Sequence, residues 1–167
     1  MSDVQARLKQ AQADVAFYES QRDQISKNLN DTHRLISDAH KKLEEVKREA
    51  AAEIPVDRSA RELSGGGPVT EDHREINPAT GMQKGYVVLS EAERSKGFVR
   101  PYRDAYRHAK CGKITTMSRD LAATYARDPK FYSGTFCSTC RAHFPVGENS
   151  EFTWYEMDGS EGPKVGT

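Results

Sequence analysis

Two short strings of the sequence hold all three of its cysteines. HAKCG covers residues 108 to 112, and CSTC covers residues 137 to 140. Each string spaces two potential metal ligands three positions apart, so that a tight turn can present both to one ion, and two such turns complete a tetrahedral zinc site. Gly112 gives the backbone after the first pair the freedom to make this turn. We therefore expect one Zn2+ to be bound by four side chains, those of His108, Cys111, Cys137 and Cys140.

Other uses of these residues remain open. His143, in CRAHF, is an alternative fourth ligand in place of His108. A redox pair needs its first cysteine at the start of a helix, and Pro145 and Gly147 disfavour a helix after CSTC. Buried cysteines without a metal are a third interpretation.

The constellation favours a structural metal over a catalytic one. Four protein ligands leave no open position for water, which a catalytic zinc needs. The zinc deaminase pattern requires H-x-E and P-C-x-x-C, and neither HAK nor TFCSTC supplies these residues. No phosphate-binding loop or nucleophile motif accompanies the cysteines. We expect no enzymatic activity and no catalytic residues.

The composition indicates a small domain with an extended appendage. The chain has 167 residues, of which 36% are hydrophobic and 30% are charged, with no formal net charge. This is too polar for one compact core of that length. An odd number of cysteines disfavours a disulfide framework and indicates reduced thiols. Without a long apolar run or a signal-peptide core, we expect a cytoplasmic protein that does not bind membranes.

Residues 1–54 are predicted to form a coiled-coil helix. Their apolar residues recur every three or four positions, and neither Gly nor Pro occurs before Pro55. Two members of this stripe, Arg22 and Thr32, are polar. We call the stripe the seam; its members are Val4, Leu8, Ala11, Val15, Tyr18, Arg22, Ile25, Leu29, Thr32, Ile36, Ala39, Leu43, Val46 and Ala50.

A single helix cannot bury such a seam by itself. Arg22 either fixes register and oligomeric state or extends to solvent. A helical hairpin that turns at residues 27–31 and docking on a foreign protein are alternatives to self-association. We favour self-association through the largest apolar members, which are Leu8, Val15, Ile25, Leu29, Ile36 and Leu43.

Pro, Gly and turn pairs dominate residues 55–84, which we expect to be a flexible linker. Residues 85–167 are predicted to form a small domain like a zinc ribbon or zinc knuckle. It should contain a strand over 86–89, a helix capped by Ser90, a second helix within 115–129 and a terminal hairpin or strand near Trp154, itself expected in the core. The fold class is therefore α+β.

A basic segment leads into the cysteines. Residues 94–130 carry ten Lys and Arg against three acids, and aromatic residues are interleaved with them. Such a stretch can bind phosphate, meet an acidic protein face, or be a solvated surface. We expect Arg103 and Arg107 to contact a partner.

The strings GYVVLSEAERSKGFVRPYRDAYRHAKCG and TYARDPKFYSGTFCSTCRAHFPVGE resemble small, largely uncharacterised proteins of tailed bacteriophages and prophages. The resemblance covers residues 78–167 and implies a phage origin and a zinc-binding domain, without a settled activity. We expect a non-enzymatic interaction or structural protein that presents a zinc-stabilised head to a phage or host protein, in the bacterial cytoplasm or in a virion. The alternative is a dimeric nucleic-acid-binding regulator that uses the basic segment.

Overall fold

The computed structural model describes residues 3–167 and is a mixed α and β structure, as expected. The chain divides into two compact units, with the boundary between Glu45 and Val46. We call residues 46–167 the head. The coiled-coil pairing and the zinc-ribbon character stay predictions.

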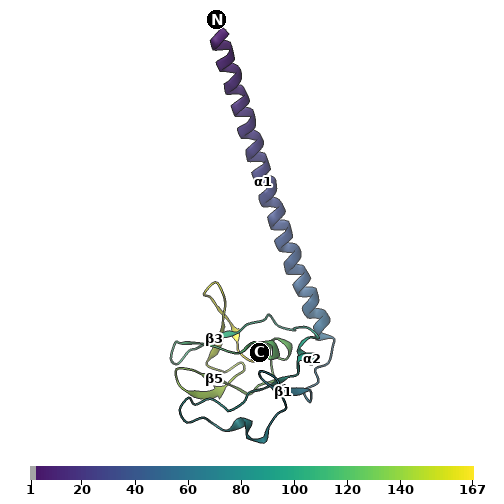
Figure 1. Ribbon diagram of the computed structural model, residues 1–167, viewed down its shortest axis with the longest axis vertical. Coiled ribbons are helices and arrows are strands. Elements are labelled where there is room, and N and C mark those ends of the chain that lie inside the picture. The colour runs from purple at the N-terminus through teal and green to yellow at the C-terminus, as the bar shows by residue number, and fades with distance from the viewer. Residues whose placement is uncertain (1–2) are drawn as a thin grey trace. The chain divides into compact units, whose positions relative to one another are not determined.

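The helix α1 (Asp3–Ala52) is continuous through residues 27–31, so the chain does not adopt the alternative helical hairpin (Figure 1). The Thr32 hydroxyl donates to the Asn28 carbonyl at 2.9 Å, so the polar residues at this point bond within the helix instead of breaking it. The six largest apolar seam residues are each between 49% and 64% exposed. The helix therefore presents an apolar stripe that no other part of the described chain covers.

The largest sheet of the head has four antiparallel strands in the order β4-β3-β7-β8. These are β3 (Ala105–His108), β4 (Ile114–Thr116), β7 (Phe152–Tyr155) and β8 (Glu161–Lys164). Tyr106, on the central strand β3, pairs with Thr115 on one side and with Trp154 on the other. The expected terminal hairpin is thus present as β7 and β8.

Two further sheets have two antiparallel strands each. The strand β1 (Arg61–Leu63) pairs with β2 (Val87–Leu89), and β5 (Gly134–Cys137) pairs with β6 (Ala142–Pro145). A 3-10 turn, η1 (Glu71–Arg74), lies between the first two strands along the chain. No strand pairs across these sheets, so they are held together by side chains and by backbone hydrogen bonds outside the strands, such as that from the Gly147 amide to the Val165 carbonyl at 2.7 Å.

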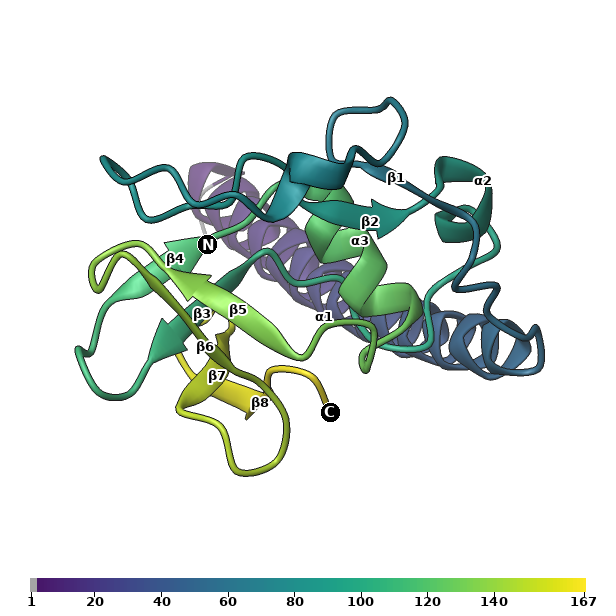
Figure 2. The same cartoon turned by 90° about the horizontal axis from the view of Figure 1, so that it is seen from below.

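Both expected helices of the head are present. The Ser90 hydroxyl accepts from the Glu93 amide at the start of α2 (Glu91–Arg94), and Ser118 accepts from the Leu121 amide at the start of α3 (Arg119–Arg127). The small residues of α3 are buried and bring the helix close to β2 (Figure 2), where the Thr124 hydroxyl accepts from the Leu89 amide.

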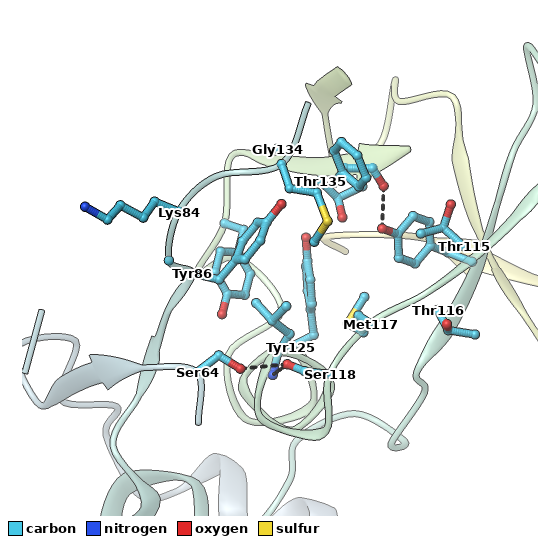
Figure 3. A pocket seen from close by; sticks show the side chains of 16 residues that line it. Ser64, Lys84, Tyr86, Thr115, Thr116, Met117, Ser118, Tyr125, Gly134 and Thr135 are labelled. Carbon is cyan, nitrogen blue, oxygen red and sulfur yellow. Dashed lines mark hydrogen bonds between the residues drawn. The ribbon is translucent and has the colours of Figure 1, made fainter. Parts of the chain in front are cut away.

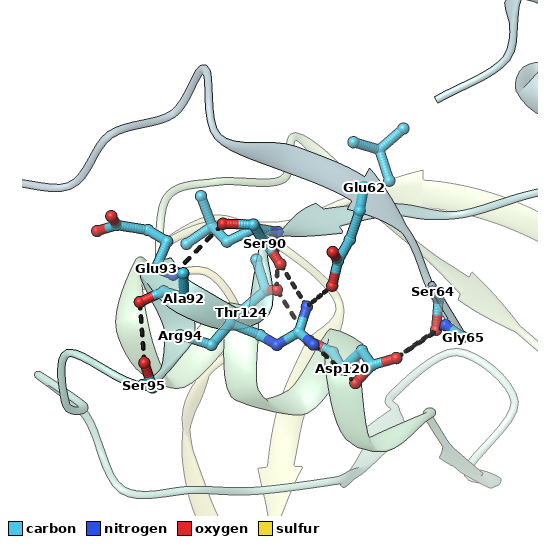
Figure 4. Close-up of polar contacts among 12 residues, drawn as sticks. Glu62, Ser64, Gly65, Ser90, Ala92, Glu93, Arg94, Ser95, Asp120 and Thr124 are labelled. Atoms are coloured by element: carbon cyan, nitrogen blue, oxygen red, sulfur yellow. Dashed lines mark hydrogen bonds and ion pairs between the residues drawn. The ribbon is translucent and has the colours of Figure 1, made fainter. Parts of the chain in front are cut away.

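Residues 55–84 differ from the expected flexible linker because they belong to the compact head. Besides the pairing of β1 with β2, Arg94 holds this segment by bridging Glu62 and Asp120, each at 3.1 Å (Figure 4). Arg94 also donates to the Leu89 carbonyl. Polar contacts to residues far along the chain therefore order a stretch whose own apolar content is low.

The end of α1 is bound to the head by a buried arginine. Arg127 is fully buried, and its guanidinium donates to the carbonyl of Ala51 at 2.8 Å and to that of Ile54 at 2.9 Å. It also pairs with Glu93, itself 2% exposed, at 3.2 Å. A cation at this place satisfies the last carbonyls of the helix and complements its dipole.

The core of the head reaches the cysteines: Cys137 is part of it and Cys111 packs against it, whereas Cys140 is exposed. Trp154 is 6% exposed, which confirms the expectation that it is a core residue. The buried cluster consists of Tyr106, Tyr125, Cys137, Phe152, Trp154 and Val165.

Candidate metal centre

Two hairpin ends bring the four expected ligands together. His108 ends β3 and Cys111 lies in the turn to β4, while Cys137 ends β5 and Cys140 lies in the turn to β6. The residue after each second ligand has left-handed backbone, with φ of 68° at Gly112 and 51° at Arg141. The two turns are therefore alike, although only the first has the glycine that the sequence makes visible.

Three distances within the cluster match the edges of a tetrahedral zinc site. All four ligand atoms lie within 4.8 Å of one another. The Sγ atoms of Cys111 and Cys137 are 3.7 Å apart, and the Sγ atoms of Cys111 and Cys140 are each 3.5 Å from His108 Nδ1. Zinc bonds of about 2.3 Å to sulfur and about 2.0 Å to nitrogen place two sulfurs about 3.8 Å apart and sulfur about 3.5 Å from nitrogen. The cluster is thus compatible with a zinc site.

Phe152 and Glu151 fix the orientation of the His108 ring. Its side chain is fully buried and stacks on Phe152, with ring centroids 4.5 Å apart and planes at 19°. Nε2 lies 2.9 Å from a carboxylate oxygen of Glu151. A proton on Nε2 donates to that oxygen and leaves the lone pair of Nδ1 directed at the three sulfurs. Glu151 was missed in the sequence because no spacing rule links it to His108; the pairing of β3 with β7 brings it there.

The thiols are perturbed in opposite directions. Burial opposes ionisation of Cys137, but hydrogen bonds from the Cys140 amide and the neighbouring thiols outweigh it and lower its pKa. Burial, together with the hydrogen bonds to Cys137 and Cys111, raises the pKa of Cys140 to about 11. Three thiols this close resist ionising together unless a cation neutralises them.

His143 lies outside the cluster. Its Nε2 is 3.1 Å from the Tyr86 hydroxyl, and its ring lies beside that of Phe136, with the centroids 5.1 Å apart. Burial lowers the pKa of His143. The described cluster therefore contains His108 and not the alternative ligand.

Much of the basic segment bonds within the head. Arg103 pairs with Glu156 at 2.7 Å, and Arg107 lies 3.9 Å from Glu161 with its guanidinium over the Tyr155 ring. Arg94, Lys96 and Arg127 pair with acids as well. These charges are compensated inside the molecule, which leaves fewer of them for a phosphate backbone.

A pocket of about 300 Å³ is lined by residues of β5, of the segment before β2 and of the start of α3 (Figure 3). Aromatic rings, among them those of Tyr86 and Tyr125, line it together with Met117, and the hydroxyls of Ser64 and Ser118 bond to each other at 2.8 Å on its wall. Such a pocket can accept a small apolar or aromatic group.

Chemically, three sulfurs and one imidazole nitrogen fill a tetrahedral shell. The buried side of the site is apolar, since the rings of Phe144 and Phe152 both lie against His108, with centroids 4.8 Å and 4.5 Å from it. An ion bound by all four side chains would have a complete tetrahedral shell, which is the coordination of structural zinc sites.

Over residues 3–167, no helix combines the length and the apolar character that crossing a membrane requires. Comparison with protein-family models, with curated proteins and with solved structures finds no match.

Proposed function

We propose that this protein is a non-enzymatic interaction protein whose head folds around one structural Zn2+ and whose helix α1 associates with a second copy. The head would then be presented to a protein partner, for which the resemblance suggests a phage or host protein. The observation that carries the metal proposal is the match between the distances in the cluster and the edges of a zinc tetrahedron.

The environment of the cluster supports zinc over the alternative uses of the cysteines. Cys111 and Cys137 are not bonded to each other at 3.7 Å, and the third thiol leaves no simple disulfide pair. Glu151 lies 2.9 Å from His108 Nε2, where a proton on Nε2 would bond to it and leave Nδ1 free to bind a metal. The two ligand pairs lie on separate sheets, so an ion bound by all four would link sheets that share no strand pairing.

Elemental analysis of the purified chain tests the metal proposal. We expect one zinc per chain, and a cobalt-substituted protein with the absorption of a tetrahedral thiolate site. His108→Ala should lose the metal, while the matched variant His143→Ala should keep it. Retention of a folded, metal-free head, or loss of zinc only in the His143 variant, would contradict the assignment.

The nucleic-acid alternative has less support. Of the two arginines that would contact phosphates, Arg103 bonds to Glu156 at 2.7 Å, and Arg107 forms only a loose ion pair with Glu161 at 3.9 Å. If nucleic acid is bound, affinity must fall steeply with salt and must be lost when both arginines are changed to Glu. Binding that meets both conditions would replace the proposal of a protein partner.

A further inference from the structure

The residues of the α1 seam indicate how two copies of the helix would align. This inference rests on the proposed self-association. The spacing places the seam residues alternately at the two core positions of a heptad. Leu8, Val15, Arg22, Leu29, Ile36, Leu43 and Ala50 occupy the a positions, and Val4, Ala11, Tyr18, Ile25, Thr32, Ala39 and Val46 occupy the d positions. In antiparallel pairs each a residue faces a d residue of the other copy, whereas in parallel pairs each residue faces its own equivalent.

An antiparallel alignment with Leu8 opposite Val46 of the second copy places every seam residue in a layer. The two polar residues of the seam, Arg22 and Thr32, then face each other instead of interrupting two apolar layers. The Thr32 hydroxyl stays bonded to its own helix, and the Arg22 guanidinium already reaches out to Asp23 at 2.8 Å. The antiparallel pair therefore contains one kind of polar layer, Arg22 against Thr32, which occurs twice. A parallel pair would contain two kinds, Arg22 against Arg22 and Thr32 against Thr32.

The same alignment complements side-chain size. Leu43 faces Ala11 and Val15 faces Ala39, so a large residue fills the space beside a small one. A parallel, in-register pair would place Ala11 against Ala11 and Ala39 against Ala39, and it would bring two Arg22 guanidinium groups together in the core. Layers of two alanines leave gaps, and paired buried cations repel.

Charges beside the seam distinguish the two orientations independently. In the antiparallel alignment, Arg7 lies opposite Glu49 and Asp14 lies opposite Lys42, and each contact occurs twice. Glu19 lies opposite His33. Opposite charges thus meet at every flanking position where both residues are charged.

The parallel orientation reverses this pattern. Positions flanking a parallel seam meet with an offset of five residues, which brings Asp14 against Glu19 and Lys42 against Lys47. Each of these pairs is repulsive, and each occurs twice. No flanking pair of the parallel arrangement joins opposite charges.

We propose that α1 binds α1 of a second copy as an antiparallel, fully overlapping two-stranded coiled coil, with Leu8 facing Val46. The exposed seam, its layer pairing and its flanking charges fit this one occupant. Because each head follows the C-terminal end of its own helix, the two heads leave the helix pair at opposite ends.

Charge reversal tests the orientation on the full, zinc-loaded chain. Asp14→Lys and Lys42→Asp should each raise the dimer dissociation constant about tenfold, because two attractive contacts become repulsive. An equimolar mixture of the two variants should recover wild-type affinity, since each helix then supplies what the other lacks. In a parallel pair, Asp14→Lys would tighten the dimer by removing its contact with Glu19. Sedimentation equilibrium measures all three cases.

Crosslinking gives a second readout. Leu8→Cys alone should not crosslink to itself, because the two copies of residue 8 lie more than about 50 Å apart along the helices at about 1.5 Å per residue. A mixture of Leu8→Cys and Val46→Cys chains should crosslink efficiently, with the wild-type chain as control for the zinc-bound cysteines. A dimer that crosslinks through Leu8→Cys alone overturns the antiparallel inference but leaves self-association intact. A chain that stays monomeric while it binds zinc overturns both.

Discussion

Arg127 offers the most direct test of how the end of α1 is held. The change Arg127→Met keeps most of the side-chain volume but removes the charge and all its donors. The carbonyls of Ala51 and Ile54 lose the guanidinium, although the Ala51 carbonyl still accepts from the Ile54 amide at 3.3 Å. Glu93, which is 2% exposed, keeps Lys96 and a hydrogen bond from the Asp57 backbone but loses its buried cation.

The expected loss of stability follows from these contacts. Breaking a buried ion pair from one side costs about 3–5 kcal/mol, because the remaining charge stays buried. Hydrogen bonds from a charged group contribute about 1.5–3 kcal/mol each, although these values overlap and do not add. We therefore expect a loss of about 4 kcal/mol, a large part of the 5–15 kcal/mol that is typical of a domain.

Urea unfolding at a fixed excess of zinc measures this loss. Trp154 is the single tryptophan and is 6% exposed, so its fluorescence reports the head. Arg107→Met is the matched control: its guanidinium is 3.9 Å from a Glu161 side chain that is 59% exposed, and it should cost less than about 1 kcal/mol. The double variant Arg127→Met, Glu93→Leu should recover at least about 1 kcal/mol, since it removes the stranded charge.

Two results would refute the reasoning. One is an Arg127→Met variant within about 1 kcal/mol of wild type, which would mean that the guanidinium does not hold the helix end. The other is a double variant less stable than Arg127→Met alone, which would mean that the Glu93 carboxylate does not depend on Arg127.

Three further predictions concern the metal site and its support. In the same urea assay, Gly81→Ala should destabilise the head by more than about 2 kcal/mol, because a Cβ there would lie 2.0 Å from the Arg141 carbonyl oxygen. The control Gly65→Ala also has a left-handed backbone, with φ of 90°, but its Cβ would meet open space, so it should cost only about 1 kcal/mol of backbone strain. Glu151→Ala should weaken zinc binding about 10- to 100-fold in competition with a chelator, whereas a change of the exposed Glu148 should leave it unaltered. Burial would raise the pKa of Glu93, but hydrogen bonds from Lys96 and Arg127 lower it overall. The stability that this carboxylate contributes is therefore present above its ordinary pKa and is lost as the pH falls through the lowered pKa. The difference in unfolding free energy between wild type and Glu93→Gln should accordingly shrink in acid.

The ligand cluster and the helix starts could be predicted because local spacing determines them. Cys137 and Cys140 lie in one turn, and Ser90 and Ser118 cap helices that begin directly after them. Each ligand pair and each helix cap involves residues a few positions apart, which is the range over which sequence patterns are informative. The meeting of the two pairs, 32 positions apart at Cys140 and His108, was expected only because four ligands complete one zinc site.

The features that could not be predicted depend on contacts between distant residues. Glu151 reaches His108 across paired strands, and Arg127 reaches the end of α1 across 76 positions. The segment 55–84 is ordered by Arg94 and by the approach of Gly81 to the turn at Arg141. A polar, glycine-rich stretch has the composition of a linker whether or not such contacts exist, so composition alone could not distinguish the two.

The placement of the two ligand pairs on separate sheets bears on the fraction of the protein that is folded in a cell. β3 and β5 share no strand pairing, and the contacts between their sheets are few, such as the Tyr106 hydroxyl on the Phe136 carbonyl and the Gly147 amide on the Val165 carbonyl. The proposed Zn2+ would add a bond between the two hairpin ends. If the site binds zinc as proposed, the folded fraction would follow the free zinc concentration, because binding to the native state alone adds RT ln(1 + [Zn]/Kd) to its stability. Chains made under zinc starvation would expose their aromatic core to proteases, and metal supply would set the abundance of the protein.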